Sequence, residues 1–168
     1  MKTILRVASV LTWFNIIIWG MIVAFGLLGV LLLGQLPYVG GFVLLSAIPL
    51  NCYAALKLHT SARYPNVPLS HQTPVGIRFV GMMALFFGIY IIYTGIAILS
   101  DPKPEIEAFR QQLAQMPQQP AWVGKMANVF TLGTGFAGLI LGLLVAINVV
   151  LNLRLLRWYY LVHKSDAS

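Results

Sequence analysis

The fold is decided by the stretch VASVLTWFNIIIWGMIVAFGLLGVLLLGQLPYVGGFVLLSAIPLNCYAAL, from Val7 to Leu56, because it contains no Asp, Glu, Lys or Arg. A membrane-spanning helix needs about 20 apolar residues to cross about 30 Å of hydrocarbon, so this stretch is too long for one crossing. The segment Gly34-Gln35-Leu36-Pro37 in its middle, followed by Gly40 and Gly41, is typical of a turn. The stretch therefore predicts two spans joined by a short turn.

Two further windows without charged residues follow, Phe79–Ser100 and Met126–Leu153. Each has the length of one membrane span. We predict an all-α integral membrane bundle of four transmembrane helices, forming a single domain over residues 1–168. The expected spans cover about residues 7–33, 38–58, 77–99 and 129–153.

The composition agrees with this class and excludes several kinds of chemistry. The chain is 59% hydrophobic and 9% charged, whereas a soluble domain has about 25% charged residues. Cys52 is the single cysteine, which excludes an internal disulfide, a thiol oxidoreductase pair and a Cys-rich metal site. No acid or base lies in the middle of an expected span, whereas ion-coupled transporters depend on such a group. We therefore predict no catalytic residue, no cofactor and no metal.

The three histidines lie at or beyond the inner ends of the expected spans, so they are poor candidates for haem ligands. They are His59, His71 and His163. We expect each to be solvated or in contact with lipid headgroups. Ser46 lies within the second span, but no general base is found for it.

The basic residues predict the orientation in the membrane, because cytoplasmic loops are rich in Lys and Arg. With four crossings, one side receives Lys2, Arg6, Lys57, Arg63, Arg78, Arg154, Arg157 and Lys164. The other side receives Lys103, Arg110 and Lys125. Both termini are therefore expected in the cytoplasm. The chain has no Asn-x-Ser/Thr acceptor site, which fits a bacterial cytoplasmic membrane.

The net charge of +7 falls entirely on the inner side in this topology, because the outer side has three cations and three acids. The net charge is thus explained by the orientation of the chain in the membrane, and no nucleic-acid partner is expected. Six inner cations are candidates for contacts with anionic lipids, each worth about 1 kcal/mol near the surface. They are Lys57, Arg63, Arg78, Arg154, Arg157 and Lys164. The alternative is that they only set the topology.

The outer connection between the third and fourth spans predicts a short amphipathic helix over about residues 104–116. Its apolar residues fall on one narrow face at about 100° per residue. They are Ile106, Phe109, Leu113 and Met116. This helix would lie on the outer membrane surface or cap the bundle. The alternative is a glutamine-rich loop without helical structure.

Four asparagines lie at similar depths in the inner half of the spans: Asn15, Asn51, Asn148 and Asn152. An amide that faces lipid leaves its hydrogen-bonding groups unsatisfied, so these side chains should point inward. We predict that Asn15, Asn51 and Asn148 form a hydrogen-bonded layer. Alternatively, each amide binds a nearby backbone carbonyl, such as that of Leu45, which Pro49 leaves without its helical donor.

Small residues four apart allow close approach of another helix. The fourth span carries Gly138, Gly142 and Ala146, and weaker pairs occur at Gly20 with Ala24 and at Ala84 with Gly88. The expected partner is a neighbouring span of the same chain. A second copy or a foreign subunit is the alternative.

These features predict a non-catalytic structural or accessory subunit that packs against itself or a larger membrane complex, with membrane lipids around it. A small channel or transporter for uncharged solutes, or a lipid-binding bundle, is the alternative. In that case the asparagines with Tyr90, Tyr93 and Thr94 would line the pathway. An enzyme is disfavoured, because Glu105 and Glu107 fall on different faces of the outer helix.

Overall fold

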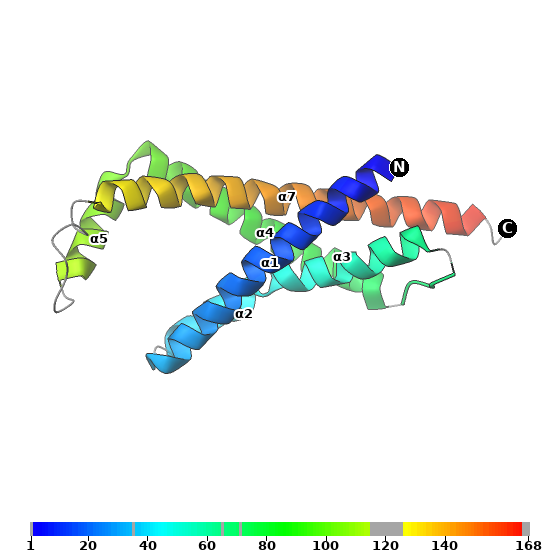
Figure 1. Cartoon of the computed structure of the whole chain (residues 1–168), viewed down its shortest axis with the longest axis horizontal. Helices are drawn as coiled ribbons and strands as arrows, with labels where there is room; N and C mark the ends of the chain where they lie inside the picture. The colour runs from blue at the N-terminus through cyan, green and yellow to red at the C-terminus, as the bar shows by residue number, and fades with distance from the viewer. Residues whose placement is uncertain (1, 35, 65, 71, 115–125, 166–168) are drawn as a thin grey trace. The chain divides into compact units, whose positions relative to one another are not determined.

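The computed structural model describes residues 2–34, 36–64, 66–70, 72–114 and 126–165, and every regular element in these ranges is a helix. The helices, shown in Figure 1, are α1 (Lys2–Leu32), the 3-10 turn η1 (Leu36–Tyr38), α2 (Val39–Leu45), α3 (Ala47–Arg63), α4 (Gln72–Ser100), α5 (Lys103–Ala114) and α7 (Ala127–Ser165).

Four helical stretches are long and apolar enough to cross a membrane: Thr3–Leu32, Val39–Arg63, Gln72–Ser100 and Ala127–Val162. The predicted all-α class with four candidate spans is confirmed, and it is consistent with an integral membrane protein. The helices extend beyond most of the expected spans, because helical hydrogen bonds continue where the sequence becomes charged. Large apolar side chains such as Val10, Phe25 and Phe79 are exposed along them, as contact with lipid requires.

The second span is interrupted at Ser46, where the sequence predicts one continuous helix. Pro49 has no N–H to donate to the Leu45 carbonyl, so one bond of the helical ladder is missing here. The Ser46 N–H is shared between the carbonyls of Phe42 and Val43, at 3.0 and 3.2 Å. The Ser46 hydroxyl also donates to the Val43 carbonyl. The span therefore consists of α2 and α3 joined at one residue.

The chain divides into two compact units. Unit 1 comprises residues 1–87 and 144–168, and unit 2 comprises residues 88–143. In unit 1, α1 packs against α2 and α3 (Figure 1). The turn after α1 uses Gly34 at a φ of +67°, a left-handed conformation that glycine adopts at low cost. A Cβ on Gly26 would lie 2.0 Å from the Phe42 ring, so glycine lets α2 sit directly on α1.

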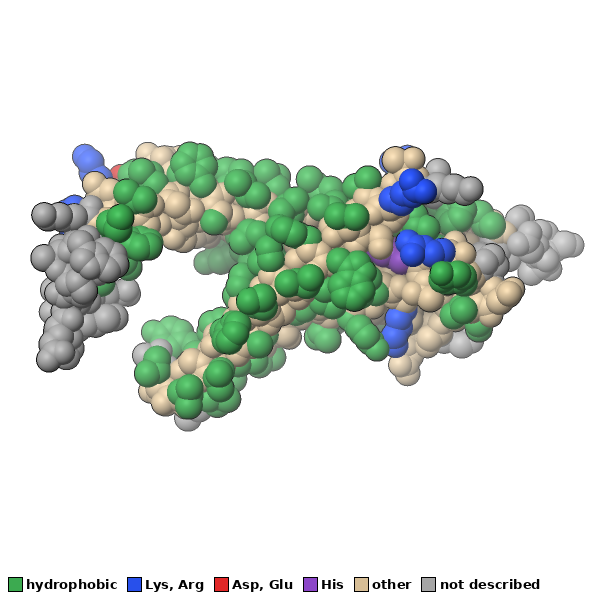
Figure 2. All heavy atoms as spheres, in the orientation of Figure 1, with side chains coloured by type: hydrophobic (Ala, Val, Ile, Leu, Met, Phe, Trp, Pro, Cys, Tyr) green, Lys and Arg blue, Asp and Glu red, His purple; other side chains and the backbone are tan. Residues whose placement is uncertain are grey.

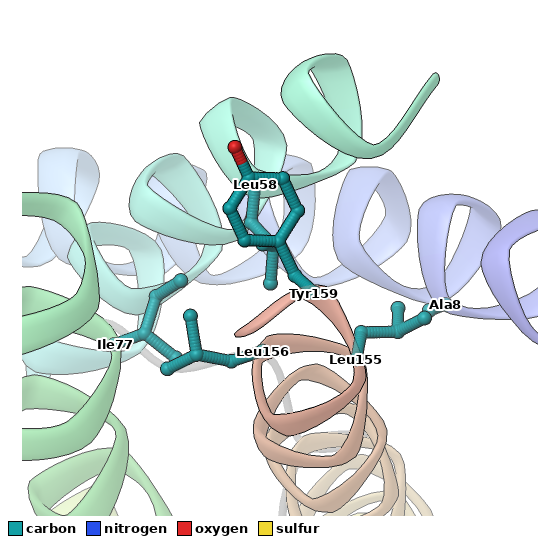
Figure 3. Close-up of a cluster of buried hydrophobic side chains, with 6 residues drawn as sticks. All are labelled: Ala8, Leu58, Ile77, Leu155, Leu156 and Tyr159. Carbon is teal, nitrogen blue, oxygen red and sulfur yellow. The ribbon is translucent and has the colours of Figure 1, made fainter. Parts of the chain in front are cut away.

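The apolar core of unit 1 draws on all four spans (Figure 3). Its buried residues are Ala8 from α1, Leu58 from α3, Ile77 from α4, and Leu155, Leu156 and Tyr159 from α7. The cluster lies towards the start of α1 and the end of α7, and Figure 1 shows these two helix ends on the same side of unit 1. The four helices of this cluster are therefore held together near the start of α1 and the end of α7.

Unit 2 depends on close contact between the backbones of α4 and α7. A Cβ on Gly95 would lie 2.8 Å from the Gly135 carbonyl oxygen, and one on Gly142 would lie 2.8 Å from the Gly88 carbonyl oxygen. Real side chains do not tolerate such distances to backbone. The two helices can approach this closely only because glycine occupies these positions.

Helix α5 packs against the start of α7 within unit 2. The rings of Phe109 and Phe130 are 6.2 Å apart, and Arg110 Nη2 donates to Asn128 Oδ1 at 3.4 Å. Of the expected apolar face, Ile106, Phe109 and Leu113 are half-buried, whereas Met116 lies outside the described residues. The apolar side of α5 thus contributes to contacts with α7.

The glycine contact predicts that Gly142→Ala lowers stability while Gly133→Ala does not. Gly133 lies on the same helix, but a Cβ there would meet no atom within 4 Å. Both substitutions gain the same helix propensity, about 1 kcal/mol, so their difference isolates the overpacking at Gly142, about 1–3 kcal/mol. Thermal unfolding in mild detergent measures the difference. Equal melting temperatures would refute the contact.

Candidate functional site

A network of buried polar side chains joins α1 to α7 in unit 1. Thr12 Oγ1 donates to Asn148 Oδ1 at 2.8 Å. Asn152 Nδ2 is shared between Asn148 Oδ1 at 3.2 Å and Thr12 Oγ1 at 3.4 Å. Because Asn148 and Asn152 are four residues apart, they share one face of α7. All three side chains are fully or almost fully buried.

Helix α3 joins the same network through His59 and Cys52. His59 Nε2 lies 2.8 Å from Asn152 Oδ1. An amide oxygen only accepts hydrogen bonds, so Nε2 is the donor, and in the neutral ring Nδ1 is left as an acceptor. Asn148 Nδ2 points to Cys52 Sγ at 3.5 Å. The amides of α7 therefore bind α1 on one side and α3 on the other.

Asn15 and Asn51 are buried beside this network, but neither shares a hydrogen bond with Asn148 among the described residues. Asn15 Nδ2 donates to the carbonyl of Leu11 on its own helix at 2.9 Å and to that of Leu144 at 3.4 Å. Asn51 faces α4, where a Cβ on Gly81 would lie 3.0 Å from its Oδ1. The expected layer is thus replaced by a network that Thr12, His59 and Cys52 complete.

Four buried polar atoms make no hydrogen bond within the described chain: Asn15 Oδ1, Trp19 Nε1, Asn51 Oδ1 and His59 Nδ1. Each unsatisfied group costs about 1–3 kcal/mol. In native proteins such groups are usually satisfied by ordered water or by a ligand. Unit 1 therefore retains hydrogen-bonding capacity that its helices do not use.

His59 also lines a pocket of about 150 Å³ between α1 and α3, together with Ser9, Trp13, Leu56, Thr60, Arg63 and Tyr64. The sequence expectation of a solvated His59 is wrong, since the side chain is only 4% exposed. The error arose because His59 follows directly after the expected end of its span. A signal was present: Asn51, Ala55 and His59 are spaced four apart, which places them on one helix face.

The small residues divide into a packed group and an open pair. Gly142 and Gly88 meet between α7 and α4, and a Cβ on Gly138 would lie 3.7 Å from the Ile91 carbonyl oxygen. Ala84 is buried and Ala146 is half-buried. On α1, by contrast, a Cβ on Gly20 would meet no atom within 4 Å, and Ala24 is exposed.

The six cations that the sequence predicts on the inner side occupy different surroundings. Arg78 and Arg157 line one groove with Leu153, Leu156, Tyr160 and Leu161. Arg63 lines the His59 pocket, and Lys57 lies 4.8 Å from the centre of the Tyr53 ring. Arg154 is exposed, and the Lys164 side chain lies outside the described residues.

The chemistry available to these sites is binding through hydrogen bonds and charge. Among the described residues, no three His, Cys, Asp or Glu side chains are grouped so as to hold a metal ion. Glu105 lines a pocket of about 190 Å³ in unit 2 with Phe109, Phe130 and Thr134, among others. The His59 pocket combines an unpaired acceptor, a guanidinium, three hydroxyls and the Trp13 ring, which suits a small polar or amphiphilic molecule.

No family model, no curated protein and no solved structure matches this chain. The interpretation of its sites therefore rests on their geometry.

The network predicts energetic coupling between His59 and Asn152. We expect the His59→Ala and Asn152→Ala double variant to be less destabilised than the sum of the single variants, because each single change already breaks the bond. A coupling of about 1 kcal/mol is the scale of hydrogen bonds between membrane helices. Unfolding in mixed detergent micelles measures it.

The matched control pairs His59→Ala with Asn128→Ala. Asn128 is exposed on α7 and binds Arg110 rather than the network. This pair should be additive within about 0.5 kcal/mol. Additivity of the His59 and Asn152 pair as well would show that the hydrogen bond carries no stability.

Proposed function

We propose that the protein is an integral membrane protein that acts as a non-catalytic accessory or structural subunit, docking to a second copy or to a larger membrane complex. The observation that carries this proposal is the open pair of small residues on α1. The other small-residue positions on α4 and α7 are largely used within the chain, whereas Gly20 and Ala24 have free space over them.

Small residues matter for docking because apolar side chains gain little by leaving lipid for another helix. Association in a membrane depends on close van der Waals contact, which small residues allow. Met21 and Ile17 flank the open pair and are exposed. The open pair would form the low part of a shallow surface, with Met21 and Ile17 as raised edges against which a partner helix could pack.

The limited extramembrane structure supports the same proposal. Outside the four candidate spans, the described helices comprise only the turn η1, the end of α7 and α5. The network of Thr12, Asn148 and Asn152 uses its polar groups to hold helices together. Interaction surfaces of this protein would therefore lie mainly within the membrane.

For the topology, we propose that both termini lie in the cytoplasm of a bacterial cell and that α5 caps the outer side. The distribution of Lys and Arg supports this orientation. Figure 2 shows basic side chains gathered at the end of unit 1 where α1 begins, and hydrophobic side chains along the rest of α1. The contact of Phe109 with Phe130 supports a capping position for α5.

The test is native mass spectrometry of the full chain from mild detergent. We expect a dimer or a copurified membrane subunit, and we expect Gly20→Leu with Ala24→Leu to abolish it by filling the open surface. Gly133→Leu is the control, because it adds a leucine at another open position. A wild-type chain that is only monomeric would contradict the proposal.

A second candidate function, a pathway for uncharged solutes, is favoured by the unpaired atoms of Asn15, Asn51 and His59. It receives no support from Tyr90 and Tyr93, which are exposed. Osmotic swelling of proteoliposomes in glycerol tests it. A pathway predicts faster swelling than in empty liposomes and a loss of that increase in Asn51→Leu, while a rate equal to that of empty liposomes would exclude glycerol passage.

A further inference from the structure

We propose that the groove between α4 and α7 in unit 1 binds an anionic phospholipid, with the phosphate between Arg78 and Arg157. The groove has a volume of about 340 Å³ and is lined by Arg78, Leu153, Leu156, Arg157, Tyr160 and Leu161. The two arginines come from different helices, 79 positions apart in sequence. Only the packing of α4 against α7 brings them to one groove.

Charge is the first argument for an anionic occupant. No carboxylate of a described residue lines the groove, and the described acids Asp101, Glu105 and Glu107 all belong to unit 2. The remaining acid of the sequence, Asp166, lies outside the described residues. Two guanidinium groups thus share a groove without a described counter-ion, and phosphate oxygens match guanidinium donors in a bidentate geometry.

The apolar lining is the second argument, and it favours a lipid over free phosphate. Leu156 is 2% exposed and forms the floor of the groove, whereas Leu161 is exposed at its rim. Leu153 is half-buried beside them. A free anion would gain nothing from this apolar surface, whereas the first methylene groups of an acyl chain can be buried against it.

The position of the groove along the helices is the third argument. Arg78 lies near the start of α4, and Arg157 lies near the end of α7. The Arg78 guanidinium carbon is 5.9 Å from the centre of the Tyr160 ring, and tyrosine is enriched at the level of lipid headgroups. The arginines therefore lie where a phosphate group would be found, with the leucines beside them.

A specific binding site requires particular arginines, whereas a general attraction of basic residues to the membrane does not. Arg154 is exposed on the same helix as Arg157, three residues earlier, but it does not line the groove. General attraction predicts that both arginines contribute equally. A site predicts that Arg157 and Arg78 contribute and that Arg154 does not.

The experiment is a titration of the purified full chain with phosphatidylglycerol or phosphatidylcholine of equal chain length, followed by native mass spectrometry. We expect the wild type to prefer phosphatidylglycerol. Arg78→Gln with Arg157→Gln should weaken that binding by about 30-fold, the loss expected for two cationic contacts. Arg154→Gln removes a cation outside the groove and should weaken binding by less than the roughly fivefold of one such contact. A third arm adds glycerol phosphate as the soluble headgroup.

Four outcomes with the wild type and the glutamine variants would overturn the proposal. These are equal binding of both lipids, an equal loss in Arg154→Gln, displacement of the lipid by millimolar glycerol phosphate, and seating of a second copy in the groove. The last would appear as a dimer that the double glutamine variant abolishes. If that variant fails to fold, Arg78→Lys with Arg157→Lys keeps both charges but loses the bidentate geometry, and it should bind with intermediate affinity. Lysine variants that bind as tightly as wild type would contradict a guanidinium site.

The lipid test is independent of the proposed accessory function. Docking through Gly20 and Ala24 is read from the mass of the protein assembly, whereas lipid binding is read from mass added to each chain. Either result can fail while the other holds.

Discussion

The hydrogen bonds among Thr12, Asn148 and Asn152 are the interaction on which the packing of unit 1 depends. Hydrocarbon offers no competing donor or acceptor, so a polar side chain within a span sets how its helix is rotated about its axis. Once Asn148 and Asn152 face α1 and α3, the residues seven positions later on α7, Leu155 and Tyr159, face the same way. These two residues belong to the apolar core. The polar network and the apolar core therefore both follow from one rotation of α7 about its axis.

Unit 2 obtains its helix contact by a different physical route. Between α4 and α7 the close approach of backbone at Gly95 and Gly142 replaces hydrogen bonds between side chains. Both routes respond to the same limitation, which is that apolar side chains gain little by moving from lipid to protein. Polar pairing and dense packing remain as sources of specificity. The chain uses each of them in a separate part of the fold.

The structure also separates residues that the sequence treats alike. Six inner cations have the same expected role from their positions in the chain, yet Arg78 and Arg157 share a groove, Arg63 adjoins His59, and Lys57 lies over Tyr53. Their surroundings depend on which helix faces lie opposite each other. Such pairings involve long sequence separations and carry no local signal, so residue spacing alone could not reveal them.

The sequence by itself determined the all-α class, the number of candidate spans and the burial of the asparagines, because hydrocarbon excludes charge and unpaired polar groups wherever they occur. The break at Ser46 is not predicted from the sequence, although Pro49, which lacks an N–H, lies three residues later. Only the tertiary structure decided that Asn148 binds Thr12 and Cys52 rather than Asn15 or Asn51, and that His59 is buried. Those outcomes depend on the rotation and relative height of whole helices, which many weak contacts across the bundle set together.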